Sequence, residues 1–232
     1  MNKSRLKLNN PLYFAFDSET GYTMNFKQLI SFLILPLLLT GCGKKYTPKP
    51  RGYFRIEFPE KKYQLIDEGF PYKFDIPVYS SVKPDMDKLA EPYWVNVLIP
   101  ENKAQIHISY KKINPSDYHK FTNEKESLTE ARKIVLAKYI EESRKLAYKH
   151  AIKADAIEER IFLNPASKVY GTIYLIEGNA ASPIQFYLTD SISHFLRGAL
   201  YISEVPNIDS LKPVINFLEP DVIRLIESTT WN

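Results

Sequence analysis

Short segments of alternating apolar and polar residues follow one another from residue 53 onward, and they predict a β-rich domain. Four such segments precede residue 112, at 53–58, 71–77, 94–100 and 104–110. The last two are joined through 101–103, which predicts a hairpin. Because successive side chains of a strand point to opposite faces, we expect Ile106 and Ile108 on the core face and His107 on the polar face.

The middle of the chain has helical spacing instead. Ser127 and Glu130 form a capping box, in which each side chain serves the other's free backbone N–H. The apolar positions that then share one helical face are Leu128, Ala131, Val135, Tyr139 and Leu146. Proline and glycine are absent until Pro165, so we expect a helix from 128 to about 150.

The second half returns to strands and ends in one or two helices. We expect strands at 156–163, 168–176, 184–188 and 195–202. Asn207 or Asp209 would cap a first terminal helix, and Pro220 would start a second one. This order predicts a single α+β domain over 53–232, an antiparallel sheet with a long middle helix and C-terminal helices packed on it.

An apolar run at 29–39 precedes the domain. It is too short to cross a bilayer, follows the positive Lys27 and ends in small residues, as secretory signal peptides do. We therefore interpret 24–41 as a signal peptide and 1–23 as an extension from an upstream start codon. A short anchor that is never cleaved is the alternative.

The signal ends at the only cysteine of the chain. Leu39-Thr40-Gly41-Cys42 resembles the bacterial lipobox, which predicts cleavage between Gly41 and Cys42 and lipid attachment to Cys42. Two or more acyl chains hold a protein stably on a membrane, whereas one gives only reversible binding. The alternative is a buried structural cysteine.

Residues 42–52 form the predicted lipid anchor and a basic, proline-containing tether. Its Pro48-Lys49-Pro50 step favours an extended polyproline II conformation. Each basic residue near an anionic membrane surface contributes about 1 kcal/mol of binding. A solvated tether without membrane contact is an equal alternative.

Composition excludes several classes of protein. Of the 232 residues, 44% are hydrophobic and 25% are charged, as in an ordinary globular chain. The net charge of +4 is too small for a nucleic-acid partner. A single cysteine excludes an intrachain disulfide and, with only four histidines, a Cys-rich zinc site.

The sequence gives no metal site. Asp85 and Asp87 resemble the start of a calcium loop, but Lys88 and Leu89 stand where further oxygen ligands belong. Phosphate-binding and dinucleotide-binding glycine motifs are also absent. We therefore expect no metal and no cofactor.

Candidate catalytic residues are equally weak. Asp190, Ser191 and His194 lie within one turn, where a nucleophile and an oriented base rarely converge. We expect these residues to satisfy their own backbone instead. Glu158 and Glu159 point to opposite faces of a strand and make a poor acid/base pair. The sequence therefore predicts no enzyme.

Aromatic residues favour recognition instead. Those of the second-half strands are Tyr170, Tyr174, Phe186, Tyr187, Phe195 and Tyr201. We expect most of them in the core and an exposed remainder that suits a protein interface. The junction at 148–157 is rich in basic and polar groups, and we interpret it as a solvated loop.

Cys42, the run from Tyr46 to Ile56, Pro59-Glu60 and Tyr63 together resemble the opening of the gliding-motility lipoprotein family GldD of Bacteroidota. Segment 148–157 and the region of Trp231 are also similar to that family. The order of strands and helices resembles the PsbP/Mog1-type sandwich, an analogy at the level of fold only.

The resemblance implies a non-enzymatic envelope protein needed for gliding and for the linked type IX secretion apparatus. Its expected partners are a membrane, through the lipid on Cys42, and other proteins of the motility and secretion machinery. Gly43 rather than an aspartate follows Cys42, which by resemblance to known sorting signals favours the periplasm-facing outer membrane, with the inner membrane as the alternative. A binding module for a lipid, glycan or peptide and a hydrolase assembled from distant residues also stay open.

Overall fold

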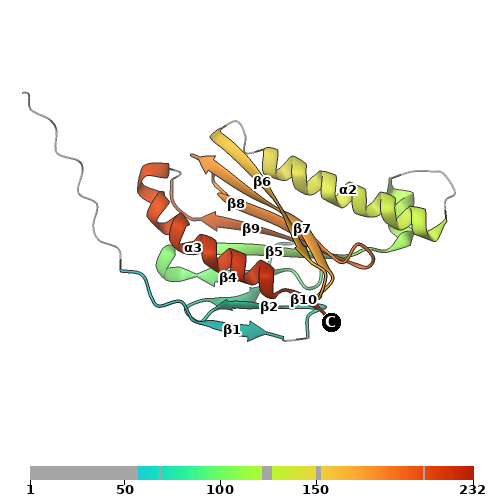
Figure 1. Cartoon of the computed structure of the whole chain (residues 1–232), viewed down its shortest axis with the longest axis horizontal. Coiled ribbons are helices and arrows are strands. Elements are labelled where there is room, and N and C mark those ends of the chain that lie inside the picture. The colour runs from blue at the N-terminus through green and yellow to red at the C-terminus, as the bar shows by residue number, and fades with distance from the viewer. Residues whose placement is uncertain (1–56, 68, 122–126, 150–152, 206) are drawn as a thin grey trace, which may run out of the picture. The chain divides into compact units, whose positions relative to one another are not determined.

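A seven-stranded antiparallel sheet runs through the middle of the structure in the order β3-β4-β5-β9-β8-β7-β6 (Figure 1). Its strands are β3 (Ser81–Pro84), β4 (Val95–Ile99), β5 (Ala104–Lys112), β6 (Ala154–Asn164), β7 (Val169–Gly178), β8 (Ile184–Thr189) and β9 (His194–Ile202). The computed structural model describes residues 57–67, 69–121, 127–149, 153–205 and 207–232.

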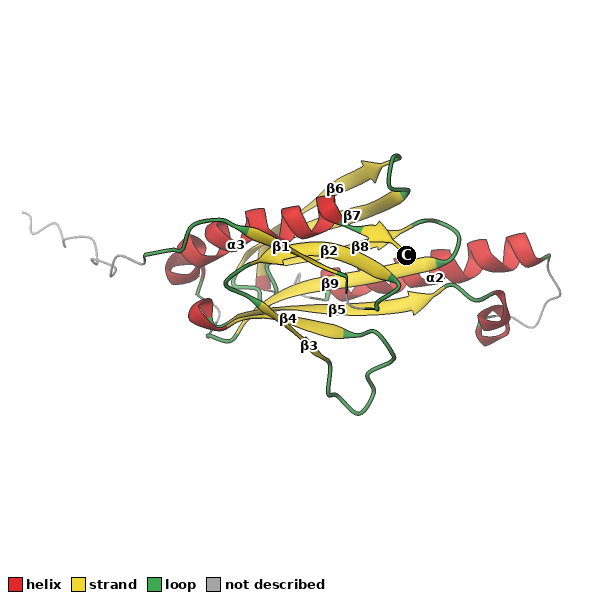
Figure 2. Cartoon of the chain, turned by 90° about the horizontal axis from the view of Figure 1, so that it is seen from below, coloured by secondary structure: helices red, strands yellow, loops and turns green. Residues whose placement is uncertain are grey.

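The long sheet has different partners on its two faces (Figure 2). One face packs against α3 (Ile208–Ser228) and a small antiparallel sheet of β1 (Tyr63–Ile66), β2 (Tyr72–Pro77) and β10 (Thr230–Trp231). The other face packs against α2 (Leu128–Tyr148). Consecutive residues of β9 show the division, since Leu196 belongs to the α3 cluster and Phe195 to the α2 cluster. Two 3-10 turns, η1 (Pro100–Asn102) and η2 (Pro115–Lys120), follow β4 and β5.

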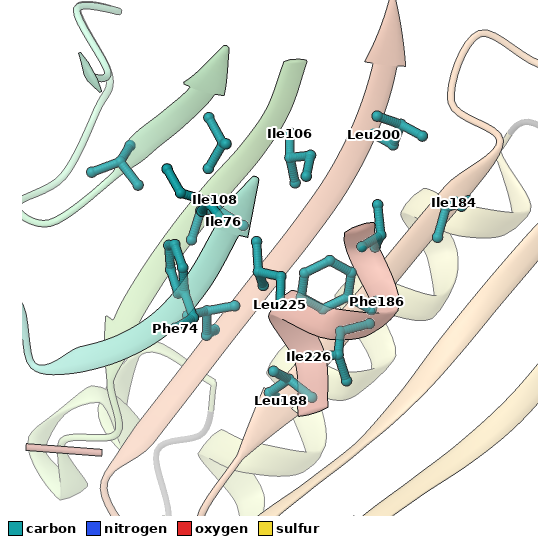
Figure 3. Packing of buried hydrophobic residues seen from close by; sticks show 14 of the residues in the cluster. Phe74, Ile76, Ile106, Ile108, Ile184, Phe186, Leu188, Leu200, Leu225 and Ile226 are labelled. Carbon is teal, nitrogen blue, oxygen red and sulfur yellow. The ribbon is translucent and has the colours of Figure 1, made fainter. Parts of the chain in front are cut away.

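The main core lies between α3, β2 and the long sheet (Figure 3). Leu225 and Ile226 of α3 are fully buried in the same cluster as Phe74 of β2 and Phe186 of β8. Phe186 lies opposite Gly198 in the β8–β9 register. A Cβ at position 198 would stand only 2.1 Å from the Phe186 ring, so glycine is required there for the ring to fit.

The predicted α+β fold is confirmed, including the hairpin at 94–110 and the four strands of the second half. The helix is also confirmed, with Ser127 as its N-cap, whose Oγ accepts the Glu130 N–H at 3.3 Å. The reciprocal half of the capping box is replaced by an ion pair, because the Glu130 carboxylate binds Lys133 at 2.8 Å.

The predicted apolar face of α2 is partly wrong. Leu128 and Leu146 are 70% and 42% exposed. The buried positions advance instead in steps of four, through Ala131, Val135, Tyr139, Ser143 and Ala147. The last two of these positions carry the small residues Ser143 and Ala147, so the buried face is not a continuous row of large apolar residues that the sequence pattern would reveal.

Of the two alternatives for the end of the chain, one helix or two, the structure has one: α3 contains Pro213 and Pro220, and Pro220 does not start a second helix. A proline removes one backbone hydrogen bond of a helix, a loss that burial of an apolar face can offset. That face continues past Pro220, with Leu218 and Val222 both fully buried.

The expected first strand is not observed as predicted. Positions 57 and 58 have no strand structure, and 53–56 lie outside the described residues. The first strand in the described part of the chain is β1, which begins at Tyr63.

Candidate functional site

The predicted lipid attachment site lies outside the part of the chain that the structure describes. This applies to Gly41 and Cys42, to the signal peptide at 24–41, to the extension at 1–23 and to the tether at 42–52. None of the helices in the described part of the chain has the length and the apolar character of a membrane span.

The turn between β8 and β9 brings Asp190, Ser191 and His194 together as a structural unit. Asp190 Oδ1 accepts the backbone N–H groups of Ile192, Ser193 and His194 at 2.8–2.9 Å. Ser191 adopts a left-handed φ of 67° and is exposed. The carboxylate therefore serves the backbone, which confirms the turn interpretation of these residues.

The imidazole of His194 is held on the α3 side of that turn. Its Nδ1 lies 2.9 Å from the hydroxyl of Tyr110, and its ring stacks on Trp231 with centroids 5.0 Å apart. Burial lowers the pKa of His194 below its usual value. The residue therefore links β9 to the C-terminal strand in its neutral form, and neither contact supplies a nucleophile.

His107 lies on the polar face of β5, as expected. Its Nδ1 is 3.0 Å from Asn96 Oδ1 and 3.4 Å from Asp85 Oδ2, and Trp94 meets the ring edge-on. Burial is the largest influence on its pKa and lowers it. A neutral imidazole fixed by Asn96 of β4 and by two residues next to strand ends supports the sheet and leaves little freedom for proton transfer.

The loop at 85–89 uses its carboxylates locally. Asp85 Oδ1 accepts the Asp87 N–H at 3.0 Å, and Asp87 Oδ1 accepts the Leu89 N–H at 2.8 Å. Such bonds stabilise a turn. In the described part of the chain, no three His, Cys, Asp or Glu side chains gather closely enough to hold a metal ion.

A cavity of about 190 Å³ lies between α2 and the polar face of the sheet. The guanidinium of Arg197 forms part of its wall and donates to Gln185 Oε1 at 2.6 Å. None of the described carboxylates lies within 4.0 Å of this guanidinium, and burial lowers its pKa. The cavity is smaller than the ~300 Å³ at which ligand pockets begin.

A larger groove of about 340 Å³ lies between β6, β7 and α3. Leu175, Ile184 and Ile215 contribute apolar wall, and charged side chains line the rest. Arg160 binds Glu158 at 2.8 Å and approaches Glu219 to 3.6 Å. Because Arg160 lowers the pKa of Glu158, this carboxyl is ionised and cannot act as a general acid at neutral pH.

A buried ion pair that the sequence analysis missed joins the start of the domain to α3. Lys61 Nζ donates to Asp221 Oδ2 at 2.6 Å, to the Phe217 carbonyl at 2.6 Å and to the Tyr79 hydroxyl at 2.8 Å. Tyr63 donates to Asp221 Oδ1 at 3.0 Å, and Tyr79 donates to Oδ2. Burial and Asp221 together raise the pKa of Tyr63 to about 12.

All three donors of the Lys61 ammonium are used, and both Asp221 oxygens accept, so this cluster is an anchor rather than a reactive centre. The available signal in the sequence is an acidic residue next to the apolar run Val222-Ile223 of the last helix. Sequence pattern does not reveal its partners, because Lys61 is 160 positions away.

The aromatic side chains of the second half belong mainly to the interior. Tyr174, Phe186 and Phe195 are buried, and Tyr170, Tyr187 and Tyr201 are half-buried. Tyr187 stacks on Phe195 beneath α2. The expected aromatic interface is therefore not a prominent surface feature of the described domain.

The most exposed apolar side chains on a described strand are on β6 instead. This strand is one edge of the long sheet and pairs only with β7 among the described strands (Figure 1). Ile161 and Leu163 are 78% and 65% exposed. Glu158 faces the groove and Glu159 the α2 side, as predicted, where the Tyr148 hydroxyl and Arg144 Nε bind it at 2.6 and 3.3 Å. We refer to residues 154–164 as the β6 edge.

Comparisons with known proteins show to which family the chain belongs. The family model described as gliding motility lipoprotein GldD matches residues 43–231. No curated protein matches the sequence. The solution structure of cyanobacterial PsbP (CyanoP) from Synechocystis sp. PCC 6803 is similar at 12% identity and a TM-score of 0.38, over 75% of this chain and 95% of that one. Because the family model extends over all but the last position of the chain after Cys42, the protein belongs to the family of gliding motility lipoproteins GldD.

Proposed function

We propose that this gliding motility lipoprotein is a non-enzymatic scaffold or assembly factor, which serves the gliding machinery and the linked type IX secretion apparatus. The observation that carries the proposal is the family match from residue 43, directly after the lipobox cysteine. A fatty acyl group such as palmitate on Cys42 would hold the domain at the periplasmic side of the outer membrane.

The use of polar side chains within the domain supports a role by contact. The carboxylate of Asp190 caps a turn, the imidazole of His107 is hydrogen-bonded to Asn96 of the neighbouring strand, and the carboxylate of Asp221 forms an internal ion pair with Lys61. Anchoring to a membrane raises the effective concentration of partners in that membrane, so modest affinities suffice.

The first test addresses the anchor. A Cys42→Ala variant should lose incorporation of a labelled fatty acid and accumulate as an uncleaved or mislocalised precursor. A Gly43→Asp variant is the matched control, because it should keep the label and change only the membrane in which the protein is found. Unchanged labelling of Cys42→Ala would refute the anchor.

The second test separates contact from catalysis. His107→Gln, Ser191→Ala and His194→Gln should each leave gliding intact at normal protein level. Loss of gliding in any of these variants with the domain still folded would replace the scaffold interpretation by an enzymatic one.

The groove between β6, β7 and α3 favours the alternative of a binding module for a lipid, glycan or peptide, because its volume reaches the lower end of the range of ligand pockets. Ile215→Trp would fill this groove. Loss of gliding in a folded Ile215→Trp protein would favour the binding module, whereas normal gliding would favour the scaffold.

A further inference from the structure

We propose that the β6 edge pairs with the β6 edge of a second copy of this chain, so that two long sheets continue into one another through an antiparallel pair. The inference deepens the proposed scaffold function by naming a partner, but its evidence lies entirely within the described domain.

The two edges of the long sheet differ in how they are protected. β3 has four residues, of which the last two are Lys83 and Pro84, and lysine and proline discourage further pairing. β6 has eleven residues without proline, glycine or lysine, and it is the outermost strand in both views of the fold (Figure 1 and Figure 2). Alternate residues of such a strand direct their N–H and C=O groups away from β7, where a further strand could bind them.

The exposed side chains of β6 also favour pairing with an additional strand. Ile161 and Leu163 project from the α2 side of β6 and are mostly exposed, whereas Val82, the apolar residue of β3, is half-buried against the core. Cross-strand apolar pairs are a main source of stability in a sheet. The β6 edge therefore offers a further strand both backbone N–H and C=O groups that point away from β7 and exposed apolar side chains.

Symmetry restricts the possible registers. A two-fold axis perpendicular to the sheet makes the strands antiparallel and keeps each face continuous, so residues of the same parity lie opposite each other. A register centred on Glu159 places Glu158 opposite Arg160 of the second copy and Ile157 opposite Ile161 of the second copy.

Charge selects this register over its neighbours. On the α3 side, Glu158 already binds Arg160 of its own strand at 2.8 and 2.9 Å. In the register centred on Glu159, two such pairs meet and the four charges alternate in sign. A register centred on Arg160 instead opposes two guanidinium groups, and one centred on Ile161 places Arg160 opposite Phe162, so the alternation of charge is lost.

The chosen register has two unfavourable contacts, Asp155 opposite Leu163 at the bulge of β6 and Glu159 opposite Glu159, and the second is partly compensated. Glu159 lies opposite its own copy, and like charges at such positions are destabilising. Each Glu159 carboxylate, however, accepts hydrogen bonds from Tyr148 and Arg144 of its own α2. The two opposed carboxylates would therefore each be paired already with the Arg144 guanidinium of their own chain.

Single cysteines test the register in the full chain expressed in its own envelope. Glu159→Cys places two sulfur-bearing side chains directly opposite each other, at a Cα separation of about 4.5–5.5 Å that fits a disulfide. Mild oxidation should give a reducible dimer at least about fivefold more abundant than from Glu158→Cys, Arg160→Cys or Ile161→Cys. Ser81→Cys, on the exposed β3 edge, and the unmodified chain with its Cys42 are the matched controls.

Charge reversal supplies an independent readout. Adding Arg160→Glu to Glu159→Cys should abolish the cross-link, and adding Glu158→Arg as well should restore it, because the alternation of charge returns. These side chains are about half exposed, so the fold is preserved. Absence of a cross-link at all four positions, or equal cross-linking at every position, would overturn the proposal. That outcome leaves the labelling of Cys42, which tests the anchor, unaffected.

Discussion

Gly198→Ala is predicted to destabilise the core through a single contact. The added Cβ would lie 2.1, 2.3 and 2.8 Å from three atoms of the Phe186 ring, whereas carbon atoms in contact are about 3.5–4.0 Å apart. The ring must therefore move by more than ~1 Å, but it is 1% exposed and lies in a core, where side chains are closely packed.

The size of the effect follows from two opposing contributions. Overpacking of this kind costs up to ~3 kcal/mol. Replacing glycine in a strand recovers ~0.5–1 kcal/mol of backbone entropy. We expect a net loss of about 2 kcal/mol, which lowers the melting temperature by roughly 4–8 °C in a domain of this length.

A double-mutant cycle, with unfolding followed by circular dichroism, identifies the cause. Phe186→Leu alone should lower the free energy of unfolding by about 1 kcal/mol. The double variant with Gly198→Ala should lose ~1–2 kcal/mol less than the sum of the losses of the two single variants. Gly171→Ala is the control, because its Cβ would stand 1.9 Å from the Tyr187 carbonyl oxygen and Phe186→Leu cannot relieve that clash. Strict additivity of Gly198→Ala and Phe186→Leu would refute the reasoning.

Three further predictions concern the same domain. Asp221→Asn should destabilise it by ~2–4 kcal/mol in chemical denaturation, because Lys61 keeps a half-buried charge without its partner, whereas the exposed Asp209→Asn should change stability by less than ~0.5 kcal/mol. The melting temperature should fall as the pH drops from 7 to 5.5, because burial lowers the pKa of His107 and His194 and the unfolded chain therefore binds protons first below pH ~6.5. Replacing both histidines by glutamine should flatten the dependence of the melting temperature on pH. An unchanged slope in that variant would show that the two histidines are not its cause. A chelator should leave the melting temperature unchanged, and a fall of several degrees would reveal a metal.

The strongest candidate functional residue, Cys42, could be predicted from sequence because its signal is local. An apolar run, two small residues and a single cysteine lie within a few positions of one another, and the predicted signal peptidase would recognise them in the unfolded chain. The anchor at Lys61 and Asp221 could not be predicted in this way, since its members are distant in sequence and meet only after α3 packs beside β1.

The amino-acid pattern by itself determined the strands at 94–110, the helix from Ser127 and the four strands of the second half. In each of these segments the periodicity is strong and the turns contain their own stabilising residues, so the information is local. The pattern also placed Glu158 and Glu159 on opposite faces, because alternation is a property of any strand.

Only the tertiary structure decided which side chains α2 buries, that α3 continues through Pro220, and which strand is left at the edge. Burial between layers outweighs the preferences of individual residues, as the small residues Ser143 and Ala147 show at the contact of α2 with the sheet. The edge position of β6 follows from the order in which seven strands pair. That order depends on pairing between strands distant in sequence, such as β5 with β9, and it therefore cannot be derived from any one segment.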